Sequence, residues 1–497
     1  MSDSPLFLAI DQGTTSSRAV LFDVDQQPIR SAQRELAQSF PQPGWVEHDA
    51  HQILEDCLTC CREVLNHQSG TLEKVAALGI ANQRETVVLW DRESGKAIHR
   101  ALVWQDRRTA EACAALRDAG LEEEVRKRTG LLLDPYFSAT KIAWMLDHIP
   151  GARAAAEEGK LAVGTIDCWL LWHLTEGRIH ATDASNASRT LLFNINTLEW
   201  DPWLCSQLGI PQSLLPEVRA TTADFGTTAT ELFGRAIPIR ALIGDQQAAT
   251  LGQHCLTPGS MKCTYGTGAF AMQNTGERCV VESRRLLTTV LWQHQGQVQY
   301  ALEGSIFSAG SAMQWLRDGL QLFERVEETE ALALQAEANS GVFLVPAFHG
   351  LGAPWWDPHA RASLLGITRG TGRAEIVRAG LEASCFQTLD LLETAKADGT
   401  PMPPNLHVDG GLCNNRWFLQ NLADILQIPI RRPVNVETTA AGAALCAALG
   451  AEIVELSEIK QQPSEGGETY QPTMSLVDRD QRYALWRNAV SRTLSGS

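Results

Sequence analysis

The sequence predicts an α/β protein built from two related halves, and three observations support that prediction. Short runs rich in β-branched residues alternate with longer helical patterns along the 497 residues, which is typical of sheets flanked by helices. The first two runs are separated by a connection that is too short for a crossover helix. A unit of strand, Gly-Thr turn and strand then recurs near the middle of the chain.

The spacing of apolar residues along the chain predicts where the individual strands and helices lie. Strands are expected where short apolar runs end in turn residues, over 6–10, 19–23, 75–81, 86–91, 162–165, 239–243, 261–265, 298–302, 342–345 and 406–409. Helices are expected where apolar residues recur at helical spacing, over 49–68, 109–118, 121–129, 138–148, 308–319, 374–396, 414–425 and 439–449. Gly and Pro residues within 252–259 predict a boundary between domains 1–252 and 253–497.

The connection between the first two strands, QGTTSSR, has the length of a hairpin, so the sheet should begin antiparallel and become mixed. Asp11 is expected at the tip of the first strand, where it could hold Mg²⁺. The turn offers backbone N–H groups and the hydroxyls of Thr14, Thr15 and Ser16 to a phosphate, and Arg18 could offset charge. A plain hairpin turn with a surface aspartate is the alternative interpretation.

Composition excludes some classes of function. Lys and Arg number 42 against 58 Asp and Glu, a net charge of −16 without a long basic run, which argues against a nucleic-acid surface. The sequence has no apolar run long enough for a membrane span and no basic start typical of a signal peptide. The twelve cysteines are scattered, so we expect reduced thiols in a cytoplasmic protein.

Two further Gly-rich turns could contact a nucleotide. The second hairpin contains Thr267 between two glycines, and with the first hairpin it could hold phosphates from both sides. The stretch LHVDGGLCNNRW places Gly410 and Gly411 between a strand and a helix, which favours a nucleotide lying against the backbone. A plain tight turn would look the same. The chain has no G-x-x-x-x-G-K-[ST] loop, so a nucleotide site would not be of the P-loop kind.

Polar residues also follow two of the central strands. Arg84 and Glu85 could exchange hydrogen bonds with neighbouring hydroxyls of a polyol, although a surface salt bridge is the simpler interpretation of such a pair. Asp245 follows another strand and is a candidate general base. Trp104 and Phe270 could wall an apolar floor, or they could be ordinary core residues.

Taken together, twelve motifs in order resemble the FGGY carbohydrate kinase family over nearly the whole chain. They are DQGTTSSRAV, PGWVEHD, NQRET, VWQDRRTA, DPYFSATK, NASRTLLFNI, GDQQAA, TYGTGAF, ALEGSIF, LVPAFHGLGAPWWDP, GLEASCFQT and DGG followed by Asn415. The resemblance implies two actin-like, ribonuclease-H-like domains with mixed sheets flanked by helices, which close over ATP and substrate in the cleft between them.

The resemblance also implies the roles of site residues. By likeness to the members that phosphorylate glycerol, the substrate-binding residues are Arg84, Glu85, Trp104, Tyr136, Asp245, Gln246 and Phe270, with Asp245 as the catalytic base. The residues implied for the phosphates are Thr14, Thr15, Ser16, Arg18 and Thr267, with Asp11 near Mg²⁺. The residues implied for the adenosine side are Gly310, Gln314, Gly411 and Asn415.

The function expected from this resemblance is transfer of a phosphoryl group from Mg-ATP to glycerol, giving sn-glycerol 3-phosphate, in a homodimer or homotetramer. A kinase for another small polyol or a ketose is the alternative within the family. An actin-like module that binds nucleotide without turnover is the alternative outside it, and the presence of Asp245 argues against that alternative.

Regulation known in some bacterial relatives is not expected here. Arg235 is present in the stretch ATELFGRAIPI, but the Gly-Gly-Thr that accompanies it in members inhibited by fructose 1,6-bisphosphate is absent. No histidine lies between residues 225 and 240, so control by histidine phosphorylation is not expected either. The segment before the last helix differs from the version that docks a sugar-transport regulator.

Overall fold

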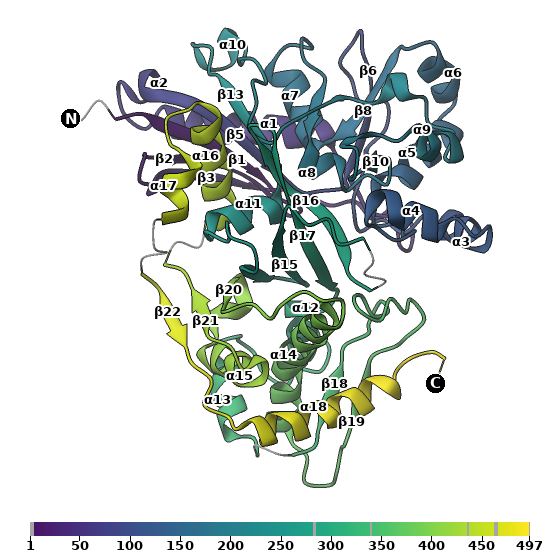
Figure 1. The fold of residues 1–497 in the computed structure, drawn as a ribbon, viewed down its shortest axis with the longest axis vertical. Coiled ribbons are helices and arrows are strands. Elements are labelled where there is room, and N and C mark those ends of the chain that lie inside the picture. Colours follow the sequence, from purple (N-terminus) through teal and green to yellow (C-terminus); the bar gives the residue numbers. More distant parts are fainter. Residues whose placement is uncertain (1–3, 282–284, 338–339, 435–436, 462–465, 497) are drawn as a thin grey trace.

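The fold is described from a computed structural model of the chain, which covers residues 4–281, 285–337, 340–434, 437–461 and 466–496. Two α/β halves are stacked along the long axis of the molecule, with the first sheet in the upper part of Figure 1 and the helices of the second half below. A long hairpin of two strands, Leu287–His294 (β16) and Gln297–Ile306 (β17), runs between the halves.

Five strands form the first sheet, in the order β13-β5-β1-β2-β3. Their bounds are Leu6–Gln12 (β1), Ser16–Phe22 (β2), Pro28–Glu35 (β3), Val75–Asn82 (β5) and Ile239–Gly244 (β13). The antiparallel start and mixed sheet are confirmed, because β1 runs antiparallel to β2 and parallel to β5. The prediction that β1 ends before Asp11 is wrong. Both neighbouring strands continue the ladder, so Asp11 and Gln12 lie within β1.

Seven strands form the second sheet, in the order β16-β17-β15-β14-β20-β21-β22. The remaining bounds are Met261–Tyr265 (β14), Ala269–Gly276 (β15), Leu406–Asp409 (β20), Ile430–Arg432 (β21) and Glu468–Tyr470 (β22). β14 pairs antiparallel with β15 and parallel with β20, which repeats the arrangement of β1 with β2 and β5. The predicted recurrence of a strand–turn–strand unit is therefore confirmed.

Smaller sheets surround these two. A four-stranded sheet in the first half has the order β4-β7-β6-β8, with bounds Glu47–His48 (β4), Val87–Asp91 (β6), Ala101–Leu102 (β7) and Leu161–Thr165 (β8). Within the described residues, three two-stranded sheets complete the set: Ala181–Asp183 (β9) with Glu217–Arg219 (β12), Phe193–Asn194 (β10) with Glu199–Trp200 (β11), and Phe343–Val345 (β18) with Ser363–Leu365 (β19).

Helices of the first half cover its sheets and extend its outer edge. They are Ala50–Leu65 (α1), Thr71–Lys74 (α2), Ala110–Asp118 (α3), Glu122–Thr129 (α4), Ser138–His148 (α5), Ala152–Glu157 (α6), Ile166–Leu174 (α7), Ala184–Ala187 (α8), Pro202–Gln207 (α9), the 3₁₀ helix Gln212–Leu214 (η1), Thr230–Phe233 (α10) and Asp245–Gly252 (α11). The sequence reading missed α7, whose nearly continuous burial leaves no polar face to give a helical period.

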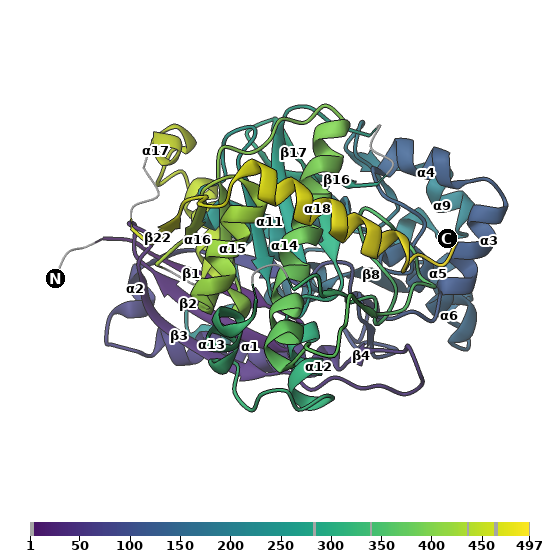
Figure 2. The same ribbon diagram turned by 90° about the horizontal axis from the view of Figure 1, so that it is seen from below.

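The second half contributes helices below its own sheet and helices beside the first sheet. They are Gly310–Asp318 (α12), Glu328–Gln335 (α13), Arg373–Ala397 (α14), the 3₁₀ helix Gly411–Asn414 (η2), Arg416–Leu426 (α15), Thr438–Gly450 (α16), Leu456–Gln461 (α17) and Leu476–Ser491 (α18). Figure 2 shows α18 crossing the outside of α14 and α15. It is fixed there by Trp486, which donates to Asp390 at 2.9 Å and stacks on Phe386.

One helix of the second half belongs structurally to the first sheet. α16 packs against β1, β5 and β13 and against α11, beside the first sheet in Figure 1. The two helix backbones almost touch: a Cβ added at Gly442 would lie 1.9 Å from the carbonyl oxygen of Ala248, and one at Gly252 would lie 2.0 Å from that of Thr438. Because α11 begins at Asp245, this packing fixes the strand-to-helix junction that carries the predicted base.

Among the described residues, no helix is both long enough and apolar enough to cross a bilayer.

Candidate active site

The hairpin predicted between the first two strands is present, and its turn is the one predicted to contact phosphate. The N–H of Gly13 donates to the carbonyl of Ser16 at 2.9 Å, which closes the turn between β1 and β2. The hydroxyl of Thr14 accepts a hydrogen bond from the indole Nε1 of Trp104 at 2.9 Å. This bond ties the turn to the aromatic wall of the predicted substrate site.

Asp11 lies in β1 opposite Arg18 of β2. Burial raises the pKa of its carboxyl to about 7, Arg18 opposes that rise, and the carboxylates of Asp245 and Glu437 add to it. Two carboxylates, Asp11 and Asp245, are thus close enough to repel each other. A divalent cation between or beside them would relieve that repulsion.

Among the described residues, no group of three His, Cys, Asp or Glu side chains could hold a metal ion. Mg²⁺ characteristically binds proteins through one or two carboxylates and takes its other ligands from water and substrate phosphates. Asp11 fits that pattern as a carboxylate ligand, and the described residues around it do not form a metal site from protein alone.

Arg18 already has side-chain partners in this structure. Its guanidinium forms an ion pair with Glu437, which precedes α16, and donates to the side-chain oxygen of Gln33 at 2.8 Å. In this arrangement Arg18 links the first sheet to the second half of the chain. A role on phosphate would require it to share or exchange these partners.

The second hairpin lies directly on the start of α12. Thr267 accepts hydrogen bonds from the N–H groups of Ala309 and Ser311, each at 3.0 Å, and Gly266 accepts one from Gly310 at 2.9 Å. A Cβ added at Gly310 would lie only 2.5 Å from the carbonyl oxygen of Gly266. Glycine at 310 is therefore required for the turn around Thr267 to take this position.

Arg84, Tyr136 and Asp245 meet as the sequence predicted. The Nε of Arg84 lies 3.3 Å from Oδ1 of Asp245, and its Nη2 donates to the Tyr136 hydroxyl at 3.4 Å. The Asp245 side chain keeps 24% of its surface exposed, so a substrate hydroxyl can reach it, whereas Arg84 is buried. Burial raises the pKa of Asp245, and the nearby Arg84 and Lys262 oppose that rise.

Glu85 is held by a residue to which the sequence reading gave no role. The Nε of Arg189 lies 2.7 Å from Oε1 of Glu85, and the Nη2 of Arg189 lies 2.8 Å from Oε1 of Glu303. The other oxygen of Glu303 forms an ion pair with Arg84. Arg189, in the turn after α8, and Glu303, on β17, both lie inside quoted motifs, but no local pattern indicates that they converge on Arg84 and Glu85.

Three aromatic rings form one wall. The ring of Trp104 lies edge-on to Tyr136 at 5.6 Å and to Phe270 at 6.0 Å between centroids. Phe270 comes from β15 of the second sheet, so the wall is assembled from both halves. The prediction that these three residues share one site is therefore consistent with the geometry.

Gln246 is engaged by a buried lysine that sequence reasoning missed. The Nζ of Lys262 donates to the side-chain oxygen of Gln246 and, at 2.9 Å, to the hydroxyl of Thr264. Burial lowers the pKa of Lys262, and Asp409 and Asp245 oppose that decrease. A lysine four residues before a Gly-Thr turn gives no recognisable motif, and its burial becomes visible only in the fold.

The residues predicted for the adenosine side lie in the second half but are not joined by one network. Gly410 has φ +94° and approaches the backbone of Tyr265, while an added Cβ at Gly411 would meet nothing within 4 Å. Asn415 caps α15 by accepting from the N–H of Phe418 at 2.8 Å and donates to Thr329 at 3.0 Å. Gln314 is exposed on α12.

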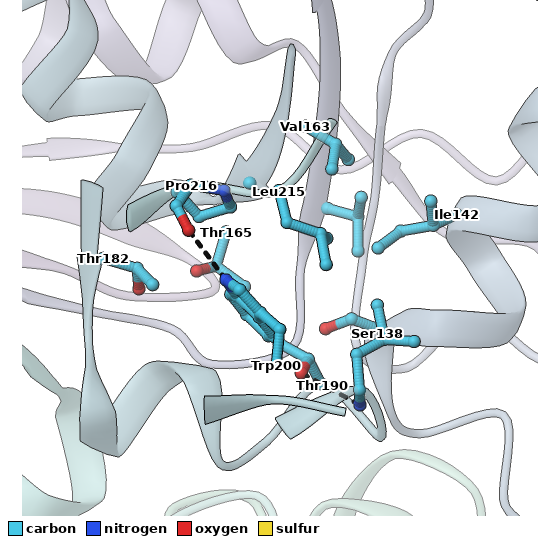
Figure 3. A pocket seen from close by; sticks show the side chains of 12 residues that line it. Ser138, Ile142, Val163, Thr165, Thr182, Thr190, Trp200, Leu215 and Pro216 are labelled. Atoms are coloured by element: carbon cyan, nitrogen blue, oxygen red, sulfur yellow. Dashed lines mark hydrogen bonds between the residues drawn. The ribbon is translucent and has the colours of Figure 1, made fainter. Parts of the chain in front are cut away.

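The cavity in Figure 3 is a different feature. It has a volume of about 20 Å³, room for a single water molecule, and lies inside the first half. Trp200 closes one side, with its indole donating to the carbonyl of Pro216 at 2.7 Å. None of the predicted site residues lines it, and it is too small for a polyol.

Comparison with known proteins gives a consistent result. The N-terminal domain model of the FGGY family of carbohydrate kinases matches residues 6–252, and the C-terminal domain model matches residues 261–451. Glycerol kinase of Alcanivorax borkumensis is 55% identical and glycerol kinase 1 of Pseudomonas aeruginosa 53% identical, each alignment covering 99% of both chains.

Solved structures agree with the sequence relatives. The crystal structure of Plasmodium falciparum glycerol kinase with ADP superposes with a TM-score of 0.92 at 36% identity, over 99% of this chain and 98% of that one. Xylulose kinase of Lactobacillus acidophilus superposes with a TM-score of 0.87 at 21% identity, over 98% of each chain, which shows the fold alone. The predicted two-domain actin-like fold is confirmed.

Proposed function

Because this chain belongs to the FGGY family of carbohydrate kinases, we propose that it transfers the γ-phosphoryl group of ATP to glycerol and forms sn-glycerol 3-phosphate. The observation that carries the proposal is the convergence of Arg84, Tyr136 and Asp245 in a site walled by aromatic rings, with Gly-Thr turns from both sheets. Glycerol offers hydroxyls for the polar groups and a short carbon chain for the rings.

Asp245 supplies the acid–base chemistry. An alcohol is a weak nucleophile, and an ionised carboxylate that accepts its proton as the oxygen–phosphorus bond forms makes it a stronger one. Arg84 holds Asp245 from one side and can donate to a substrate hydroxyl. Glu85, fixed by Arg189, can accept from another hydroxyl, so the substrate is oriented while Asp245 takes the proton.

The two hairpins support the phosphate groups. Their backbone N–H groups and the hydroxyls of Thr14, Thr15, Ser16 and Thr267 are the donors proposed for the phosphate oxygens. Asp11 would hold Mg²⁺ together with those oxygens, and when bound this ion neutralises negative charge on the phosphates. Gly310, Gln314, Gly411 and Asn415 are proposed for the adenosine side.

Several further features are part of this proposal. We assign residues 1–252 to a domain that mainly binds glycerol and residues 253–497 to one that mainly binds nucleotide, with closure excluding water from the reaction. Because α16 of the second half packs against the first sheet, this helix holds the two halves together. We expect a cytoplasmic homodimer or homotetramer.

We also expect that fructose 1,6-bisphosphate does not inhibit the protein. Arg235, the residue that such inhibition would involve, already donates to the carbonyls of Leu72 and Glu73.

The test is coupled ADP release with Mg-ATP against glycerol, dihydroxyacetone, xylulose, ribulose and gluconate, with a control lacking substrate. We expect the highest kcat/KM with glycerol. Activity with a larger sugar alone would keep the fold but overturn the assignment of Arg84, Glu85, Trp104 and Tyr136. ADP release that does not depend on any of these substrates would contradict the kinase proposal.

A further inference from the structure

Four buried charged side chains form a closed bracket around the predicted polyol site. Arg84 pairs with Glu303, Glu303 pairs with Arg189 at 2.8 Å, and Arg189 pairs with Glu85 at 2.7 Å. Arg84 and Glu85 are neighbours in sequence, so the chain closes on itself. We call these four residues the charge bracket.

Glu303 is the only member of the charge bracket that comes from the second half of the chain. It lies on β17, opposite Met272 of β15, and the next pair of that ladder on the same face joins Ser305 to Phe270. β15 begins just after the Gly-Thr turn that contains Thr267. A movement of the second sheet therefore shifts Glu303 together with Phe270 and the phosphate turn.

The charge state of Glu303 suits it to orient two guanidinium groups. Its side chain has no exposed surface. Burial alone would raise the pKa of Glu303, but Arg189 and Arg84 outweigh burial and hold the pKa below its ordinary value. The carboxylate is therefore ionised, and each of its oxygens directs a different arginine.

Stability alone does not account for this arrangement. A buried ion pair is weak evidence of stabilisation, because desolvation offsets most of the attraction. The charge bracket is also incompletely satisfied: among the described residues, Nη1 of Arg189 has no hydrogen-bond partner. What the bracket does achieve is to fix the directions of Arg84 and Glu85, the two side chains assigned to substrate hydroxyls.

We propose that Glu303 is a positioning residue that orients Arg84 directly and Glu85 through Arg189, and that it makes the polyol site depend on the position of the second sheet. The inference rests on the proposed function, because the polyol is the ligand that Arg84 and Glu85 would bind. It adds Glu303 and Arg189 to the residues that determine affinity for that substrate.

The chain offers a matched control for the test. Glu382 on α14 is also a buried glutamate that pairs with two arginines, Arg378 and Arg482, each at 2.6 Å. Through Arg482 it joins α14 to α18, and Figure 2 shows α18 on the outside of the second half. Glu382→Gln therefore removes the same charge from a similar environment without touching the charge bracket.

The experiment compares wild type, Glu303→Gln, Glu303→Asp and Glu382→Gln. For each, KM and kcat are measured separately for glycerol and for ATP, and glycerol binding is measured without nucleotide by titration calorimetry. For Glu303→Gln we expect glycerol KM and Kd to rise roughly 10- to 100-fold, a typical result of misplaced substrate-orienting groups, while ATP KM stays within about twofold. Glu303→Asp keeps the charge and should recover part of the loss.

Equal losses for glycerol and ATP in Glu303→Gln, or an unchanged glycerol KM, would overturn the proposal. If Glu303→Gln does not fold, Arg189→Lys replaces it: lysine keeps the charge but cannot contact Glu85 and Glu303 at once, so glycerol KM should rise and an unchanged value would overturn the proposal. Failure of the proposed function looks different, because wild type and Glu382→Gln would then release no ADP in response to glycerol, and that result would overturn both.

Discussion

The Nε of Arg84 lies 3.3 Å from Oδ1 of Asp245, so the predicted substrate-orienting cation is in direct contact with the predicted base. This contact has two consequences. It fixes the direction of the Asp245 carboxylate, and it favours the ionised form that can accept a proton.

Asp245→Asn should lose turnover and keep the fold. The amide cannot accept a proton at neutral pH, and loss of a general base typically costs 10²- to 10⁴-fold in rate. The amide oxygen can still accept from the Gln246 N–H, which now donates to Oδ1 at 2.7 Å, so the start of α11 is preserved. Coupled ADP release, thermal unfolding and binding of a non-hydrolysable ATP analogue measure the three properties. A variant with nearly wild-type turnover would remove Asp245 from the mechanism.

The pH profile should reveal the electrostatics around Asp245. Burial raises the pKa of Asp245 above its ordinary value. As the pH is lowered, kcat/KM should therefore begin to fall at a higher pH than it would with an exposed aspartate as the base. Lys262 opposes the rise, so Lys262→Met should move the acid limb to still higher pH. Profiles of kcat/KM for glycerol from pH 5 to 9 test this, with the exposed Lys160→Met as control. A limb that stays in place in Lys262→Met, or moves to lower pH, would contradict the account.

Asp11→Asn should lower activity and raise the stability of the ligand-free protein. The pKa of Asp11 is raised from 3.8 to about 7 by burial, so between these pH values the folded protein holds a proton that the unfolded chain has released. Stability of the ligand-free protein therefore falls as pH rises through this window, and the substitution removes that loss. We expect the Tm advantage of Asp11→Asn over wild type to grow from pH 5 to pH 8.

The same variant should turn over poorly and gain less stability from Mg-ATP than wild type does. Coupled ADP release measures the turnover, and differential scanning fluorimetry with and without Mg-ATP measures the gain in stability. A wild-type Tm that does not decrease relative to Asp11→Asn across this pH range would show that Asp11 is not buried against other carboxylates as described.

Two glycine substitutions should separate packing from nucleotide contact. Gly310→Ala places a Cβ 2.5 Å from the Gly266 carbonyl and should lower both Tm and activity, because the turn around Thr267 must shift. Gly411→Ala meets nothing within 4 Å and should leave Tm unchanged while it raises the KM for ATP. If Gly411→Ala has a wild-type KM for ATP, residue 411 does not lie against the nucleotide.

The comparison of sequence and structure shows which features were accessible to local reasoning. Asp11, Thr267 and Asp245 follow short apolar runs, and a polar residue after such a run is a local signal, so these residues could be singled out one by one. Glu303 and Lys262 lie inside strands as isolated charges, where the local pattern indicates nothing. Their roles depend on pairing between β15, β17 and distant elements, and only the folded chain brings such residues together.

Errors in the predicted elements have the same origin. The first strand was expected to end before Asp11, because a carboxylate is unusual inside a buried strand, but the ladders on both sides continue past it. The place of α16 on the first sheet was not predicted either. Its composition is almost uniformly apolar, so it signals burial without indicating which sheet it covers.

Identification of the product tests the central claim most directly. Wild-type protein is incubated with glycerol and Mg-ATP, and phosphorus NMR with chiral analysis identifies the phosphorylated species, with Asp245→Asn as the control. The account predicts one product, sn-glycerol 3-phosphate, formed by wild type and nearly absent with the variant. Inorganic phosphate as the sole product, or equal product from Asp245→Asn, would contradict it.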